Sequence, residues 1–78
     1  MIQKTKKLVI TFHTTTDAMA MEIACKAAGV QGRLIPVPRS ISAGCGLAWC
    51  ANPENEASIR ALMNARGLRF QEIHLCPV

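Results

Sequence analysis

The sequence predicts an α+β fold, a two-layer sandwich with a four-stranded antiparallel sheet and two helices on one face. The chain has 78 residues, a length that suits one domain spanning residues 1–78. Four short apolar stretches have strand-like patterns, and two longer stretches have helical spacing. Their order is strand, helix, strand, strand, helix, strand, which is typical of the ferredoxin-like βαββαβ arrangement. That arrangement has the spatial strand order 4-1-3-2.

The first strand and the first helix are predicted from alternation and from capping residues. In residues 7–13, Leu8, Ile10 and Phe12 fall on one face of an extended chain. Residues 14–17, Thr-Thr-Thr-Asp, offer an N-cap and a first-turn carboxylate, and Gly29 ends the helix. Ala20, Ile23, Ala24 and Ala27 follow at helical spacing, which predicts a helix of about three to four turns.

The remaining elements follow from prolines, caps and apolar runs. Residues 33–37 predict a short strand at a sheet edge, because a proline within it cannot donate to a neighbouring strand. Residues 46–51 predict the third strand, and residues 52–54, Asn-Pro-Glu, begin a helix that Arg66-Gly67 closes. Residues 68–75 predict the last strand, in which broken alternation indicates a bulge or a register change.

Composition narrows the classes of function. The net charge is +4, but apart from a cluster of lysines near the start the basic residues are scattered, so we expect no nucleic-acid partner. No apolar run approaches the ~18 residues of a membrane span, so we expect no membrane association and a cytoplasmic location. Cysteines in that reducing compartment are expected to be free thiols. No cofactor is indicated, and the oligomeric state stays open.

A glycine-flanked cysteine is the most informative local feature. Residues 42–46 read Ser-Ala-Gly-Cys-Gly, so neither neighbour of Cys45 has a side chain that blocks access to the sulfur. In the predicted topology this segment lies at the sheet edge where the first helix begins, near His13 and Arg39. A helix N-terminus, an arginine or a protonated histidine would each lower the pKa of the thiol and favour the reactive thiolate.

Several supporting residues are therefore candidates around this thiol. They are Gly44, Gly46, Arg39, His13 and Ser42. The backbone amides around residues 44–46 could form an anion-binding nest. His13 could instead be an ordinary histidine at the end of a strand, and Arg39 could be an ordinary solvated arginine.

The other three cysteines are weaker candidates. We expect Cys25 to be a small buried hydrophobe and Cys50 to face the core or the sheet, whereas Cys76, near the end of the chain, could be exposed and has no evident partner. Cys50 and Cys76 fall near the edge opposite Cys45, which disfavours a shared metal site, and C-x-x-C spacing is absent. A cluster of Cys50, His74 and Cys76 stays open as a metal-binding alternative, although no metal is expected.

Two segments carry a resemblance to a known family. Residues 34–39, Leu-Ile-Pro-Val-Pro-Arg, and residues 42–48, Ser-Ala-Gly-Cys-Gly-Leu-Ala, resemble the selenium/sulfur carrier protein-like family, and the likeness covers nearly the whole chain. The resemblance implies a small cytoplasmic, often bacterial protein that carries sulfur or selenium as a persulfide or selenopersulfide on the cysteine corresponding to Cys45.

The main hypothesis is therefore that the protein is a carrier, which relays a chalcogen on Cys45 from a donor persulfide enzyme to an acceptor protein. A carrier role is favoured over that of a turnover enzyme. The alternative is a non-catalytic ferredoxin-like binding or regulatory module that uses the loop edge around residues 38–46. A redox-sensing role for the Cys45 thiol is a third possibility.

Overall fold

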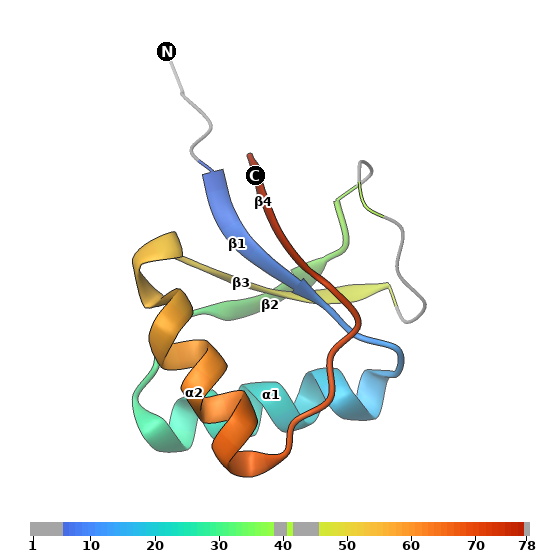
Figure 1. Ribbon diagram of the computed structural model, residues 1–78. Helices are drawn as coiled ribbons and strands as arrows, with labels where there is room; N and C mark the ends of the chain where they lie inside the picture. The colour runs from blue at the N-terminus through green and yellow to red at the C-terminus, as the bar shows by residue number, and fades with distance from the viewer. Residues whose placement is uncertain (1–5, 39–40, 42–45, 78) are drawn as a thin grey trace.

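The sheet and its two helices adopt the predicted order. The computed structural model describes residues 6–38, 41 and 46–77. Its elements are β1 (Lys6–Thr11), α1 (Thr15–Ala28), β2 (Arg33–Pro36), β3 (Leu47–Ala51), the 3₁₀ turn η1 (Pro53–Asn55), α2 (Glu56–Arg66) and β4 (Ile73–Pro77). The sheet order is β2-β3-β1-β4 with every pair antiparallel, and both helices lie on one face (Figure 1). The α+β, ferredoxin-like prediction is confirmed, as is the edge position of β2.

The main core lies between the sheet and the helices. Alternate side chains of β1 point into it, and Trp49 of β3 is only 1% exposed, as expected for a packing residue. The buried members of this cluster are Leu8, Ile10, Phe12, Ala18, Met21, Cys25, Trp49, Ala51, Ile59 and Met63. Removal of these apolar surfaces from water holds the two layers together.

Helix α1 is capped as predicted, and it buries a face that the spacing of its apolar residues did not indicate. The Thr14 hydroxyl oxygen accepts a hydrogen bond from the Asp17 backbone N–H at 3.1 Å. The buried residues are Ala18, Met21, Ala24 and Cys25, whereas Ile23 is 66% exposed. Because each helical residue turns by about 100°, Ile23 points about 200° away from Met21. Of the four residues whose helical spacing predicted this helix, only Ala24 is among the buried ones.

Helix α2 begins differently from the prediction. A 3₁₀ turn at Pro53–Asn55 precedes it, and the Asn52 side chain makes no capping hydrogen bond. The Asn52 Oδ1 atom instead accepts a hydrogen bond from Lys7 Nζ at 2.6 Å. Asn52 and Pro53 thus occupy the predicted N-cap and first-turn positions, but at a 3₁₀ turn, and the capping hydrogen bond is absent because the Asn52 side chain binds Lys7, 45 residues away along the chain.

Strand β4 begins at Ile73, five residues later than predicted, because a bulge precedes it. The Thr11 N–H donates to the Glu72 carbonyl, while the Gln71 N–H donates to the Thr11 carbonyl, at 2.8 and 2.7 Å. Two residues thus oppose Thr11, which is the geometry of a β-bulge. The Glu72 N–H donates to the Thr11 hydroxyl oxygen at 3.0 Å, so the extra amide is satisfied.

Candidate functional site

Four chain segments meet at one edge of the sheet. Pro36, the last residue of β2, pairs with Leu47, the first residue of β3, and Thr11, the last residue of β1, pairs with Ala48. Helix α1 begins four residues after Thr11. His13 and Gly46 each lie two residues beyond the Thr11–Ala48 pair, so both belong to this edge. The predicted convergence of these segments is confirmed.

Gly46 stands where the chain enters β3, and its backbone requires glycine. Its φ of 77° lies in the left-handed region, and a Cβ there would meet no heavy atom within 4 Å. The Val37 N–H donates to the Gly46 carbonyl at 3.0 Å, which extends the pairing of β2 and β3 by one step. Gly46 is exposed, so solvent and partner molecules reach the backbone at this position.

The start of α1 adds oriented amides to the same edge. Thr14 satisfies the Asp17 N–H through its side chain, and the Thr14 carbonyl accepts from the Ala18 N–H at 3.2 Å. The other first-turn amides lack such intrahelical partners, and the helix dipole adds a partial positive charge. The Asp17 carboxylate in the first turn offsets part of that charge. His13 is exposed directly before this cap.

Four of the predicted site residues, Arg39, Ser42, Gly44 and Cys45, lie outside the described residues. His13 and Gly46 are the two whose positions the structure gives. The Cys45 site therefore stays a prediction, built on the edge that borders it.

The open face of the sheet carries a second apolar cluster that extends toward this edge. Val9 and Ala48 are fully buried there with Cys76, although no helix covers them. Ile41, which lies between β2 and β3 in the chain, packs against this cluster together with Ile35 and Val37. The sequence analysis did not identify Ile41. The feature that could have indicated it is that Ile41 is a single large apolar residue in a segment of otherwise small and polar residues.

The three described cysteines differ in their surroundings. Cys25 is fully buried, as predicted, and burial raises the pKa of its thiol. Cys76, whose exposure the sequence left open, is also buried, at 8% exposure. Burial, and then the negative charge of neighbouring Cys50, raises the pKa of the Cys76 thiol. Cys50 is half-buried.

A metal site is not formed by the described part of the chain. No group of three or more His, Cys, Asp or Glu side chains there is arranged to hold a metal ion. His74 of the Cys50, His74 and Cys76 alternative instead has its Nε2 atom 3.1 Å from Glu72 Oε1. Among the described helices, none has the length and apolarity needed to cross a membrane.

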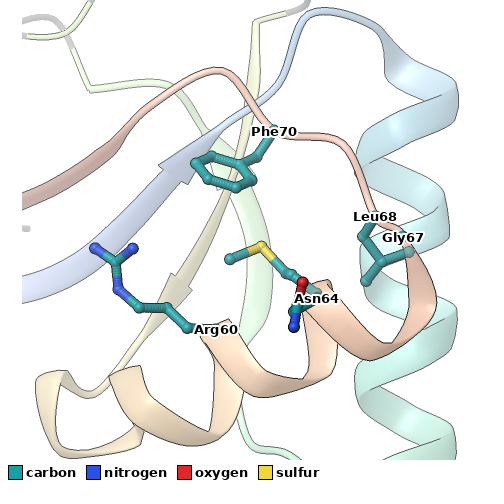
Figure 2. Close-up of a pocket in the computed structure, with 6 residues that line it drawn as sticks. Arg60, Asn64, Gly67, Leu68 and Phe70 are labelled. Atoms are coloured by element: carbon teal, nitrogen blue, oxygen red, sulfur yellow. The ribbon is translucent and has the colours of Figure 1, made fainter.

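A hollow of about 320 Å³ lies beside the end of α2 and carries no chemical group that could act as a nucleophile. Figure 2 shows the Phe70 ring above it, with Arg60 and Asn64 on the helix below. The Arg60 guanidinium is held by Glu56 at 2.8 Å, one turn earlier in the helix. We assign this hollow no role.

The comparisons with known proteins add one result. A family model described as "Putative Se/S carrier protein-like" matches residues 7–75, nearly the whole chain. No curated protein and no solved structure matches the chain.

Proposed function

Because the chain belongs to the Se/S carrier protein-like family, we propose that it holds sulfur or selenium on the Cys45 thiol and relays it from a donor enzyme to an acceptor protein. The observation that carries this proposal is the exposed, left-handed Gly46, which follows Cys45 directly in the chain. A partner cysteine must approach the sulfur closely, and a glycine at this position leaves room for it.

The surroundings of two other cysteines support the choice of Cys45. A carrier thiol must be ionised and reachable, because the thiolate is the nucleophile. Cys25 and Cys76 are buried, and the pKa of each is raised, so both are protonated at neutral pH. Cys50 is half-buried and lies near the end of β3, whereas Gly46 directly precedes the start of that strand.

The proposed chemistry is thiol exchange at a divalent sulfur. The Cys45 thiolate attacks the outer sulfur of a donor persulfide and forms a new S–S bond. The donor S–S bond breaks, and its electron pair leaves with the donor cysteine as a thiolate. An acceptor nucleophile then attacks the outer sulfur on Cys45 and returns the Cys45 thiolate. Selenium follows the same sequence as a selenopersulfide.

The neighbouring groups have supporting roles in this proposal. Gly44 and Gly46 give access, and the amides of residues 44–46 hold the persulfide anion. Arg39 and His13 favour the anion electrostatically, with Ser42 as a further polar neighbour. The proposal needs Cys45 as a free thiol before loading, and thiols are kept reduced in the cytoplasm, so the cytoplasm is the compartment that fits this proposal.

Loading by a donor tests the proposal. Wild-type protein is incubated with a cysteine desulfurase and cysteine, and intact mass is measured. We expect a gain of one sulfur atom that Cys45→Ala abolishes and that the buried-thiol control Cys25→Ala retains. A gain unchanged in Cys45→Ala would contradict the proposal. Full biological activity of Cys45→Ser would instead support the binding-module alternative, because serine keeps the size but cannot carry a persulfide.

A further inference from the structure

A second polar hollow lies at the opposite edge of the sheet from His13 and Gly46. It has a volume of about 260 Å³, and its lining residues are Lys7, Gly32, Arg33, Cys50, Ala51 and Asn52. It combines two cations, one amide and one thiol. None of the acidic side chains lines it.

The sheet register explains why cations flank this thiol. Cys50 pairs with Arg33 of β2 on one side and with Val9 of β1 on the other. Directly paired residues lie on the same face of a sheet, and so do residues two apart in one strand. Lys7, two residues before Val9, therefore shares the face of Cys50 and Arg33. The Cys50 thiol therefore lies between β2, which carries Arg33, and β1, which carries Lys7.

Hydrogen-bond donors remain available in this hollow. Lys7 Nζ donates to Asn52 Oδ1 at 2.6 Å, which fixes its position and uses one of its three N–H groups. Arg33 is exposed and carries five donors. The ion pairs found within the described residues involve neither Lys7 nor Arg33. A small anion would find both cations able to donate.

A second thiol, that of Cys76, lies on the same face of the sheet as Cys50. Cys76 of β4 pairs with Lys7 on the same open face. Burial and the charge of Cys50 both raise the pKa of Cys76, which keeps the Cys76 thiol protonated at neutral pH. Cys76 is buried and Cys50 is half-buried, so Cys50 is the more accessible of these two thiols.

We propose that this hollow binds a small oxyanion that carries a transferable sulfur, with thiosulfate as its simplest form, and that Cys50 removes that sulfur. Lys7 and Arg33 hold the sulfonate oxygens, as cations hold oxyanions elsewhere in proteins. The outer sulfur then lies toward Cys50. This activity uses neither Cys45 nor the opposite edge, so it goes beyond the carrier function.

The transfer balances without an external oxidant or reductant. The Cys50 thiolate attacks the outer sulfur of thiosulfate, and a new S–S bond forms. The S–S bond of thiosulfate breaks, and its electron pair leaves with sulfite. Cys50 remains as a persulfide anion, and the total charge is the same on both sides.

Sulfite release and intact mass after addition of thiosulfate test this activity. We expect wild-type protein and Cys45→Ala to gain one sulfur atom and to release one sulfite per chain, whereas Cys50→Ala does neither. Arg33→Met should react about tenfold more slowly than the control Arg69→Met, because a charge-assisted hydrogen bond to the anion is lost. Arg69 is also an exposed arginine and lies outside the hollow.

Three results would overturn the proposal: no sulfite release at saturating thiosulfate, release that persists in Cys50→Ala, or equal rates for Arg33→Met and Arg69→Met. Inorganic sulfate has no transferable sulfur, so it tests anion binding in the hollow without the reaction, and the same spectra show whether the variant is folded. Addition of sulfate to ¹⁵N-labelled Cys50→Ala should shift the amides of residues 32–33 and 50–52, and shifts confined to other residues would contradict the site. Sulfur loading by the desulfurase that persists in Cys45→Ala would contradict only the carrier proposal, so the failures of the two proposals are distinguishable.

Discussion

The three described cysteines show how position decides what a thiol can do. Cys25 lies in the main core and Cys76 in the cluster on the open face, and both are buried. Cys50 lies on that same open face but between two cationic strands. Burial disfavours the thiolate in the first two, so their contribution is to packing and not to sulfur chemistry.

Burial of Cys25 makes stability depend on pH. Its pKa is raised in the folded protein, so the unfolded chain loses this proton first. The stabilisation is full below the unfolded thiol pKa of ~8.5 and is lost as pH rises through the folded value. We expect the unfolding free energy of wild type to fall between pH 7 and pH 10 more than that of Cys25→Ala, measured by urea denaturation. An equal fall in both proteins would show that Cys25 ionises as freely in the folded state as in the unfolded one.

At the scale of elements, the segment between α1 and β2 is fixed by contact with β3. Gly32 has a φ of 149°, and a Cβ there would lie 2.5 Å from the Trp49 Nε1 atom. The Trp49 indole is buried in the core and cannot move away easily. The start of β2, and with it Arg33, therefore depends on a residue without a side chain.

Gly32→Ala should destabilise the protein by about 3 kcal/mol, since overpacking of a core costs roughly 1–3 kcal/mol and positive φ adds about 1–2 kcal/mol. Gly67→Ala is the matched control, because Gly67 has a φ of 63° but no heavy atom within 4 Å of a Cβ. That control should lose only about 1–2 kcal/mol. Thermal or urea unfolding measures both, and equal losses would mean that the Trp49 contact does not constrain this segment.

Across the whole molecule, features encoded locally were predictable from the sequence. The alternation of Leu8, Ile10 and Phe12, the Thr14 cap and the closing glycines gave the order of the elements, and that order gave the sheet topology and the shared edge of His13 and Gly46.

Features that depend on distant partners were not predictable. Helix α1 is rich in alanine, so its sequence does not define which face is buried. The start of β4 depends on Thr11, whose hydroxyl lies 61 residues away from Glu72 along the chain. The cations beside Cys50 come from two separate strands and meet only through the sheet register.

We propose two sulfur sites on this molecule, and the main one is Cys45 as the carrier of the chalcogen that a donor enzyme supplies. The most direct test is to load wild-type protein with a cysteine desulfurase, block free thiols by alkylation, digest the protein and locate the persulfide by mass spectrometry. We expect the additional sulfur on the peptide that contains Cys45, with Cys25 and Cys76 unmodified by sulfur. Additional sulfur confined to Cys25, Cys50 or Cys76 would contradict the carrier proposal.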